Sequence, residues 1–229
     1  MDVLIPAYNE AGYVGRTVSV LKALPAIGSI LVVDDGSTDG TAREAEEAGA
    51  RVIRLRRNMG KGAAVLAGAR CLKAPYLALL DADLGESAAE IERLLRPLQD
   101  QQASMTVALF PRPARPGGLG TVKKLAAWSV RRCTGFNLRE PLSGQRVFRR
   151  ELLELLRHPP RGFGLEIALS MDLLGQGYTV LEVETAMGHR ERGRDPASIL
   201  HRGRQFTAVL RELWLRKDLL FRGKAYCGK

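Results

Sequence analysis

The stretch LALLDADLGES, residues 77–87, decides the fold class of this chain. Its apolar first half predicts a buried strand, which ends in Asp81-Ala82-Asp83. Residues two apart on an extended chain point to the same side, so both carboxylates are expected at the carboxyl end of the strand. Such hard oxygen ligands suit Mg²⁺ or Mn²⁺, which usually also bind substrate phosphates. Alternatively, the two aspartates only start a turn and cap the helix that follows.

Predicted strands and helices alternate on both sides of this stretch. Apolar runs predict strands at residues 2–7, 29–34, 51–55, 76–80, 103–110 and 179–184. Helical spacing separates most of them, as at residues 41–48 and 121–133. Parallel strands need helical crossovers, so this order predicts an α/β fold with a mostly parallel sheet and helices on both faces.

Two of the predicted helices have sequence features that predict how each helix begins or packs. Ser87 and Glu90 have the spacing of a capping box before a helix that starts near Ile91. The helix that begins with FGLE, residues 163–166, is predicted to have one apolar face, formed by Ile167, Leu169, Leu173 and Leu174.

Polar clusters follow three of the predicted strands: Tyr8-Asn9-Glu10, Asp34-Asp35 and Asp81-Ala82-Asp83. Lys61 lies among glycines at a helix start, where backbone N–H groups and the helix dipole favour phosphate. Ligands of open α/β sheets bind outside the carboxyl ends of the strands. These clusters are therefore predicted to meet on one edge of the sheet.

Length, apolar content, net charge and cysteine number limit the kind of protein and the kind of binding partner that the sequence allows. The 229 residues suit a single domain, and an apolar share of 45% argues against disorder. The net charge of +10 favours anionic partners such as sugar nucleotides, phosphorylated acceptors or a membrane surface. Nucleic acid explains the charge less well, because no reader motif is present. The three cysteines are widely separated, so neither a zinc cluster nor a disulfide framework is indicated.

The first residues predict no signal peptide, since the apolar start runs straight into Pro6. No apolar run approaches the roughly 18–20 residues that span a bilayer. We therefore expect a cytoplasmic protein that rests at most peripherally on the inner face of the membrane.

Residues 198–222 predict a long basic amphipathic helix. Its apolar stripe consists of Phe206, Val209, Leu210, Leu213 and Trp214, and arginines and lysines flank it. Such a helix can lie in a membrane interface beside anionic lipid. The alternative is that the stripe closes the core or forms a homodimer interface.

Four motifs of the first hundred residues, in order and in register, resemble family 2 nucleotide-sugar glycosyltransferases, which have the Rossmann-like GT-A fold. The motifs are IPAYNE (5–10), VDDGSTDGT (33–41), NMGKG (58–62) and DADL (81–84). The second half is similar to polyprenyl-phosphate sugar transferases through SGQRVFRR (143–150), FGLE (163–166) and the Arg-Gly stretch after the last strand. At Gly85 the chain departs from the polyprenyl-phosphate mannosyltransferases, which usually have Gln there.

The resemblance implies one GT-A domain over residues 1–229, with a donor half (1–100), an acceptor half (101–197) and a C-terminal basic helix (198–229). The implied activity is sugar transfer from a nucleoside-diphosphate sugar, UDP- or GDP-linked, to a phosphorylated or hydroxyl acceptor such as polyprenyl phosphate or phosphoglycerate. The implied cofactor is Mg²⁺ or Mn²⁺. The implied nucleotide-binding residues are Pro6, Ala7, Tyr8, Glu10, Asp34, Asp35, Lys61, Asp81 and Ala82.

The resemblance also implies metal, catalytic and acceptor residues. Asp83 would bind the metal directly, and Asp81 would hold the ribose or a metal-bound water. His189 lies where related enzymes, including glucosyl-phosphoglycerate synthases, supply a third metal ligand, although a lone histidine is often structural. The catalytic residues would be Asp83, Glu166 and Arg146, and Arg146 is also a candidate for gripping a phosphorylated acceptor or the diphosphate. The acceptor or phosphate contacts would come from Ser143, Gly144, Arg190 and Arg192.

Glu166 has three open roles. It could take a proton from an acceptor hydroxyl, as an inverting transferase requires. If the acceptor is a phosphate, no base is needed, and Glu166 would orient the acceptor or hold Arg146. It could also be only a carboxylate favoured by a helix N-terminus.

Two other functions are compatible with parts of the pattern. A nucleotidyltransferase also uses paired aspartates, but its glycine-rich signature would follow the first strand, where this chain has PAYNE. A non-catalytic protein could keep the fold to bind a nucleotide or a membrane, although Glu10, Lys61, Asp81 and Asp83 are all present.

Overall fold

The computed structural model describes residues 1–111, 121–156, 158, 164–188 and 196–221. Its strands are β1 (Asp2–Ala7), β2 (Ile30–Asp34), β3 (Arg51–Arg54), β4 (Tyr76–Leu79), β5 (Met105–Leu109), β6 (Arg146–Arg149) and β7 (Val180–Glu184). The α-helices are α1 (Val14–Lys22), α2 (Thr41–Glu47), α3 (Lys61–Ala69), α4 (Ile91–Gln99), α5 (Thr121–Thr134), α6 (Leu165–Gly175), α7 (Pro196–Leu215) and α8 (Lys217–Phe221). Two 3₁₀ helices, η1 (Gly85–Glu90) and η2 (Arg150–Leu155), complete the described elements.

The strands form one seven-stranded sheet in the order β3-β2-β1-β4-β6-β5-β7. All neighbouring pairs are parallel except the two that involve β6, which runs antiparallel to β4 and β5. The predicted mostly parallel α/β sheet is therefore confirmed. β6 was missed, because RVFR is short and begins and ends with arginine, unlike the apolar runs that predict the other strands.

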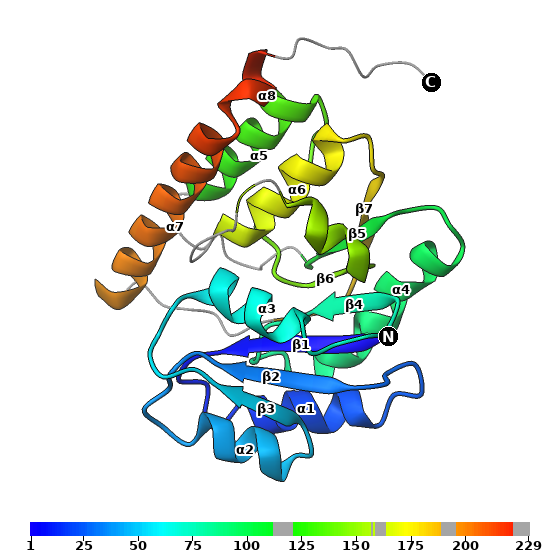
Figure 1. Cartoon of the computed structure of the whole chain (residues 1–229), viewed down its shortest axis with the longest axis vertical. Coiled ribbons are helices and arrows are strands. Elements are labelled where there is room, and N and C mark those ends of the chain that lie inside the picture. Colours follow the sequence, from blue (N-terminus) through cyan, green and yellow to red (C-terminus); the bar gives the residue numbers. More distant parts are fainter. Residues whose placement is uncertain (112–120, 157, 159–163, 189–195, 222–229) are drawn as a thin grey trace.

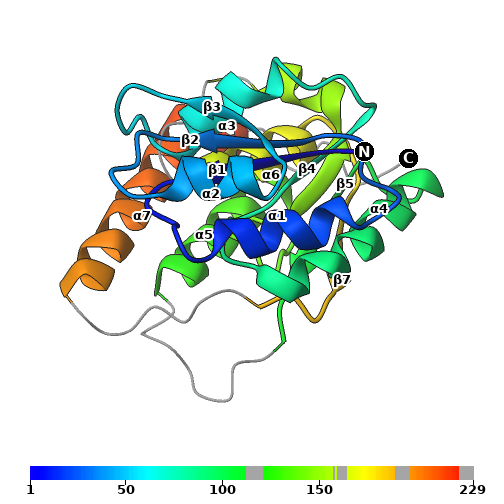
Figure 2. The same ribbon diagram turned by 90° about the horizontal axis from the view of Figure 1, so that it is seen from below.

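Helices cover both faces of the sheet, as Figures 1 and 2 show. Alternating residues of each strand point to opposite faces, so Val3 and Ile5 pack on one side and Leu4 on the other. The first side is covered by α1, α2 and α4, and the second by α3 and α6. A further layer of α5, α7 and α8 packs on α6.

α6 is buried on every side, from Leu165 to Leu174. The prediction of a single apolar face was wrong for this helix. One side of α6 packs on the sheet through Leu165, Leu169 and Leu173. Its other side contacts the α5, α7 and α8 layer through Ile167 and Met171. The polar members Glu166, Ser170 and Asp172 are buried as well, so each of them needs a partner inside the protein.

The predicted capping box before α4 was also wrong. The chain first makes η1, and neither η1 nor α4 has a side-chain cap hydrogen bond. The Ser87 hydroxyl instead donates to the carbonyl oxygens of Leu84 and Gly188. Ser87 therefore ties the turn after the paired aspartates to the segment that follows β7.

The C-terminal pattern forms two helices, α7 and α8, separated at Arg216. The predicted apolar stripe divides between two environments. Val209 is fully buried against α5 and α6, whereas Phe206, Leu210 and Trp214 are exposed. The expectation that the stripe closes the core thus applies to only part of it. None of the helices in the described ranges has the length and apolar character needed to cross a bilayer.

Candidate active site

The functional edge of the sheet is the one at which β1, β2 and β4 end. These strands are parallel neighbours, so the residues after Ala7, Asp34 and Leu79 leave the sheet on the same side. β3 is parallel to β2, so the loop that leads from it to Lys61 starts at this edge too. The predicted convergence of the polar clusters on one edge is confirmed.

β6 brings the second half of the chain to the same edge. Because β6 is antiparallel to β4, its first residue, Arg146, pairs with Leu79 at the end of β4. The preceding residue, Gln145, therefore lies beside the paired aspartates, and its Nε2 donates to Asp81 Oδ2 across 2.9 Å. Gln145 was not singled out from the sequence, although it lies inside the 143–150 motif.

Lys61 is the centre of the polar cluster. Its Nζ lies 2.7 Å from Asp81 Oδ1 and 2.7 Å from Glu166 Oε1, so it joins the end of β4 to the first turn of α6. Burial lowers the pKa of Lys61, but Asp81 and Glu166 outweigh that effect and raise the pKa above its ordinary value. Lys61 is therefore a fixed cation, and three of the predicted site residues are in direct contact.

Two buried polar atoms near this cluster have no hydrogen-bond partner among the described residues. They are Ser143 Oγ and Gln145 Oε1. Buried polar atoms in folded proteins are normally paired, so each unpaired one requires an explanation. Both belong to the loop that ends at β6, beside the carboxylate of Asp81. They are thus candidate contacts for a molecule bound beside the cluster.

Thr17, on α1, holds the turn of the paired aspartates. Its hydroxyl donates to Ala82 O across 2.7 Å and accepts a hydrogen bond from Gly85 N at 2.9 Å. Ala82 is buried, whereas Asp83 is partly exposed at the edge of the sheet. The alternative that Asp81 and Asp83 cap the next helix is not supported, because η1 has no side-chain cap. No sequence signal pointed to Thr17.

The loops after β1 and β2 are joined by side-chain hydrogen bonds. Asn9 Oδ1 accepts from Thr38 N, and Asn9 N donates to Ser37 Oγ, both across 2.9 Å. Glu10 N donates to Thr41 Oγ1 across 2.8 Å. Next to these bonds, Tyr8 is 45% exposed and presents its ring to solvent. Of the predicted nucleotide-binding residues, Pro6 and Ala7 end β1, and Tyr8 and Glu10 lie on the braced loop that follows it.

Asp34 and Asp35 are both buried and support neighbouring loops. The two Asp35 carboxylate oxygens accept hydrogen bonds from Met59 N and Gly60 N, each across 2.7 Å. Asp34 Oδ1 accepts from Ser37 N across 2.9 Å. Asp35 is only 3% exposed, and its side chain lies between the end of β2 and the loop before α3. Its observed contacts position the loop that carries Lys61.

Arg146 was predicted to contact the acceptor, and the structure corrects that prediction. The residue is fully buried, and its guanidinium donates to Ser143 O, Pro141 O and the Ser170 hydroxyl across 2.8–2.9 Å. Burial lowers the pKa of Arg146 to about 10, while Glu166 and Glu182 act in the opposite direction. Arg146 thus remains a cation at neutral pH and braces the loop before β6 against α6.

Three predicted site residues, His189, Arg190 and Arg192, lie outside the described residues. Gly188, the last described residue before them, exchanges hydrogen bonds with Ser87 at 3.1 and 3.2 Å. In the described ranges, no group of three His, Cys, Asp or Glu side chains has the arrangement of a metal site. Asp83 and Asp81 nevertheless fit Mg²⁺ or Mn²⁺, because these ions are often held by one or two carboxylates together with substrate phosphates.

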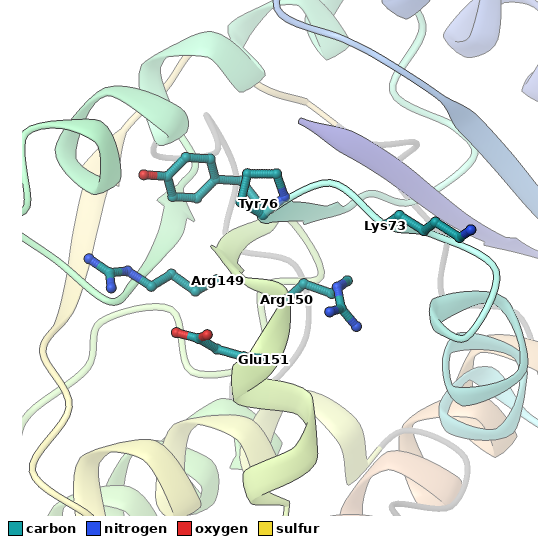
Figure 3. A pocket seen from close by; sticks show the side chains of 6 residues that line it. Lys73, Tyr76, Arg149, Arg150 and Glu151 are labelled. Carbon is teal, nitrogen blue, oxygen red and sulfur yellow. The ribbon is translucent and has the colours of Figure 1, made fainter.

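A pocket of about 500 Å³ lies at the opposite edge of the sheet (Figure 3). Its lining includes Tyr76, at the start of β4, and Arg149, at the end of β6. Nucleotide ligands of α/β sheets bind outside the carboxyl ends of the strands, whereas this pocket faces the amino end of β4. We therefore place the candidate site at the Lys61 cluster and not in this pocket.

The comparisons with known proteins agree with that position. A family model described as "Glycosyl transferase family 2" matches residues 2–156, about two thirds of the chain, and this segment includes Lys61, Asp81 and Asp83. The chain belongs to glycosyl transferase family 2. The class of enzyme predicted from the sequence, a glycosyltransferase, is thereby confirmed.

Two members of the family with known names are similar over most of this chain. Polyprenol monophosphomannose synthase from Mycolicibacterium smegmatis is 33% identical over 213 residues, which cover 83% of this chain and 78% of that protein. Glycosyltransferase AglJ from Haloferax volcanii is 31% identical over 198 residues. That match covers 84% of this chain but only 64% of AglJ, so this chain spans just under two thirds of that relative.

Solved structures of glucosyl-3-phosphoglycerate synthase from Mycobacterium tuberculosis have the same fold as this chain. The complex with Mn²⁺, UDP-glucose and phosphoglyceric acid superimposes with a TM-score of 0.76 at 26% identity, covering 94% of this chain and 78% of that one. The complex with Mg²⁺ and UDP has the same TM-score at 27% identity. The predicted GT-A fold is confirmed by these similarities.

Gly144 provides a test of the packing of this family 2 site. A Cβ atom at Gly144 would lie 2.6 Å from both Asp81 Oδ2 and Lys61 Nζ, so Gly144→Ala must displace the ion pair. Overpacking of this kind costs roughly 1–3 kcal/mol. We expect sugar transfer to fall by about tenfold or more, since a misplacement of about 1 Å in an active site can cost up to a hundredfold in rate.

The control for Gly144→Ala is Gly203→Ala on α7, where the added Cβ meets no atom within 4 Å. Transfer by the Gly203→Ala variant should equal that of the unaltered protein. Steady-state transfer kinetics and thermal unfolding of both variants measure these effects. Full activity of Gly144→Ala would show that the Lys61–Asp81 contact tolerates displacement.

Proposed function

We propose that this glycosyltransferase moves a sugar from a UDP- or GDP-linked donor to a phosphorylated acceptor, with Mg²⁺ or Mn²⁺ as cofactor. The observation that carries the proposal is the polar cluster at the carboxyl edge of the sheet. There Lys61, whose side chain is 18% exposed, bridges two carboxylates, 2.7 Å from each, beside a loop with two unpaired polar atoms. Such an arrangement combines a cation for phosphate with carboxylates for a divalent metal.

The donor occupies the loops that follow β1, β2 and β4. Pro6, Ala7, Tyr8 and Glu10 line the pocket for the base and ribose, and the exposed ring of Tyr8 offers a flat apolar surface for the base. Lys61 reaches the diphosphate. In this assignment residues 1–100 form the donor half of the protein and residues 101–197 the acceptor half.

Asp83 is the direct metal ligand, and Asp81 holds the ribose or a metal-bound water. His189 is assigned as a third ligand. Support for this assignment comes from the hydrogen bonds of Gly188, the preceding residue, to Ser87 in the 3₁₀ helix that follows Asp83. A divalent cation on the diphosphate offsets the negative charge that accumulates as the sugar leaves.

The acceptor occupies the side of the cluster formed by Ser143, Gly144 and Glu166. A phosphate acceptor already carries its nucleophilic oxygen as an anion, so it needs no general base. Glu166 then orients Lys61 and the acceptor. Arg190 and Arg192 supply additional positive charge. The acceptors of two similar proteins support this class: one is a polyprenol monophosphomannose synthase, and the other was crystallised with phosphoglyceric acid.

Polyprenyl phosphate and phosphoglycerate differ in where the enzyme must work. A polyprenyl phosphate is anchored in a bilayer. An enzyme that uses this acceptor must therefore work in a peripheral position on the inner face of the membrane. We propose polyprenyl phosphate, because two relatives that match this chain over more than four fifths of its length are named for such acceptors. Phosphoglycerate is the alternative that the assay must include.

A thermal-shift panel of UDP-, GDP-, ADP- and CDP-sugars, each with and without Mn²⁺, tests the donor. A ligand at 100 times its Kd adds about 2.7 kcal/mol of stability, which corresponds to about 5–10 °C for a chain of this size. We expect this shift for a UDP- or GDP-sugar and only with the metal. Radiolabelled sugar transfer to polyprenyl phosphate or phosphoglycerate then identifies the acceptor. A panel without any metal-dependent shift would contradict the proposal.

A further inference from the structure

The outward face of α7 carries a stripe of large apolar side chains. Phe206, Leu210 and Trp214 are 41%, 42% and 65% exposed. They are spaced four residues apart, which places them along one side of a helix. The opposite side of α7 is buried through Val209 and Glu212, and Arg216, which follows α7, is buried as well. The stripe is therefore not needed to close the core, and a soluble protein rarely leaves such a continuous apolar strip without a partner.

Cationic side chains lie on the same helix pair and on the neighbouring helix α5. Lys217 places its Nζ 5.3 Å from the centre of the Trp214 ring, and Arg211 is partly exposed on the same helix. The neighbouring α5 packs against α7 and carries four exposed cations, Lys123, Lys124, Arg131 and Arg132, of which Lys123 pairs with Glu140. Trp128 is 53% exposed on α5 as well. The acidic residues near the stripe in the described part of α7 and α8 are the buried Glu212 and the partly buried Asp218.

We infer that this face, called here the α7 stripe (Phe206, Leu210 and Trp214 with Arg211 and Lys217), docks on an anionic lipid surface. Tryptophan and other bulky apolar side chains insert at the headgroup level of a bilayer, and lysine and arginine beside them bind anionic headgroups. A second copy of this chain is a poorer occupant. A twofold contact would bring the same cations of both copies together, and like charges repel.

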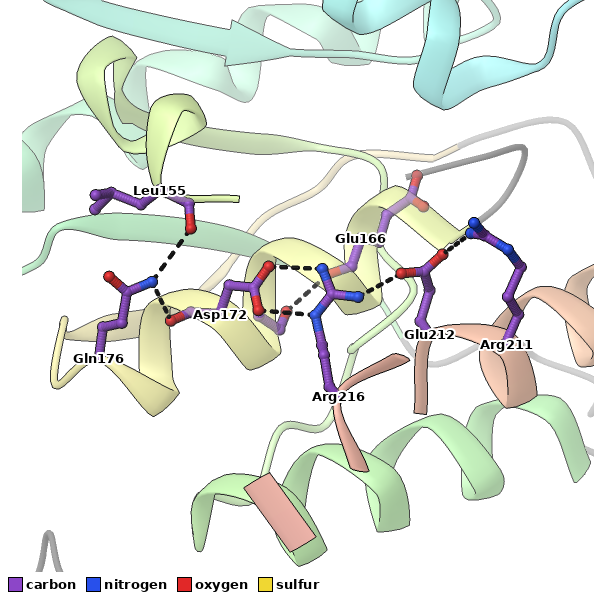
Figure 4. Close-up of polar contacts among 8 residues, drawn as sticks. Leu155, Glu166, Asp172, Gln176, Arg211, Glu212 and Arg216 are labelled. Carbon is purple, nitrogen blue, oxygen red and sulfur yellow. Dashed lines mark hydrogen bonds and ion pairs between the residues drawn. The ribbon is translucent and has the colours of Figure 1, made fainter. Parts of the chain in front are cut away.

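The buried side of α7 connects this stripe to the candidate site. Arg216 pairs with Asp172 of α6 across 2.6 Å and also with Glu212 (Figure 4). Glu212 in turn packs against Gly164, since a Cβ atom there would lie 2.7 Å from its side chain. Gly164 directly precedes α6 and is two residues from Glu166. A helix is about 10 Å wide. Docking through α7 would therefore hold the acceptor side of the site about one helix diameter away from the lipid surface.

This inference rests on the proposed function, because a lipid-linked acceptor is what gives the docking its purpose. The docking itself can be measured without donor or acceptor. Flotation of the full chain with vesicles of phosphatidylcholine, or of phosphatidylcholine and phosphatidylglycerol in equal parts, provides the first measurement. We expect binding to the anionic vesicles only, and weaker binding as salt concentration rises.

A triple variant, Phe206→Ser, Leu210→Ser and Trp214→Ser, is expected to bind anionic vesicles at least tenfold more weakly. The matched comparison is Leu210→Ser against Leu181→Ser on the edge strand β7, because Leu210 and Leu181 have similar exposed fractions of 42% and 38%. Only Leu210→Ser should weaken binding. In a Trp128→Phe background, the fluorescence of Trp214 should shift to shorter wavelength when anionic vesicles are added.

The outcomes separate this inference from the proposed function. Absence of binding by the unaltered protein, or equal binding by the triple variant, would overturn the docking. An unaltered dimer that becomes monomeric in the triple variant would assign the stripe to a homodimer interface instead. The donor-induced thermal shift of the same variants is the independent readout of the proposed function. Vesicle binding without any donor-induced thermal shift would support the docking and contradict only the proposed function.

Discussion

Replacement of Asp83 by alanine is expected to reduce sugar transfer by about a hundredfold or more, because a metal ion supplies several kcal/mol of stabilisation to developing charge. The same change should abolish the Mn²⁺-dependent thermal shift by the donor. Asp83 is partly exposed on a turn that Thr17 holds through Ala82 and Gly85, so its side chain can be removed while those hydrogen bonds remain. Transfer assays and thermal unfolding with and without metal measure both effects.

Asp100→Ala is the control for this variant, because Asp100 is an exposed aspartate that follows α4. It should keep full activity and the full metal-dependent shift. Asp83→Asn keeps the shape of the side chain but loses its charge, and it should resemble Asp83→Ala. Unchanged transfer by Asp83→Ala would refute the metal assignment, even if the donor still binds.

Replacement of Arg216 by methionine is expected to produce the largest loss of stability. Arg216 is fully buried, and its Nε and Nη2 lie 2.8 and 2.6 Å from the two carboxylate oxygens of Asp172. Removal of Arg216 takes a buried guanidinium partner away from two buried carboxylates, Asp172 and Glu212, which costs roughly 3–5 kcal/mol. The midpoint of thermal unfolding should fall by about 10 °C for a chain of this size. Calorimetry or circular dichroism measures the change.

Two comparisons identify the cause of that loss. Arg54 pairs with Glu46 across 2.7 Å, but both side chains are about half exposed. Because exposed pairs contribute about 0–1 kcal/mol, Arg54→Met should change stability little. The combination of Arg216→Met with Asp172→Asn and Glu212→Gln removes the charges together and should recover part of the loss. If the triple variant is no more stable than Arg216→Met, the loss arises from packing and not from unpaired charge.

The parts of the fold that follow from local patterns were predictable. β1, β2 and β4 are apolar runs that stop at polar residues, and this pattern both predicts the strand and places its carboxyl end. The convergence of Lys61 and Asp81 followed from the direction of parallel strands alone. The family motifs added roles for these residues that spacing did not supply.

The parts that depend on tertiary context were not predictable from the sequence. β6 is a four-residue strand with arginine at both ends, and only its place between β4 and β5 makes it a strand. Arg146 has the residue type of a phosphate ligand, yet its burial beside Ser170 turns it into a brace. The burial of α6 on all sides depends on the layer of α5, α7 and α8, which lies at distant positions in the chain.

The reversed strand β6 also sets the order in which the site can be completed. β6 follows β5 in the chain but lies between β4 and β5 in the sheet, and β7 is bonded only to β5 among the described strands. Without β6 the sheet would be two separate pieces, β3-β2-β1-β4 and β5-β7. During synthesis the loops after β1 and β2 can therefore fold early on a sheet of their own, whereas the side of the site that includes Gln145 must wait until β6 has been added. The edge that carries the candidate site therefore spans the seam at which β6 joins the two pieces of the sheet.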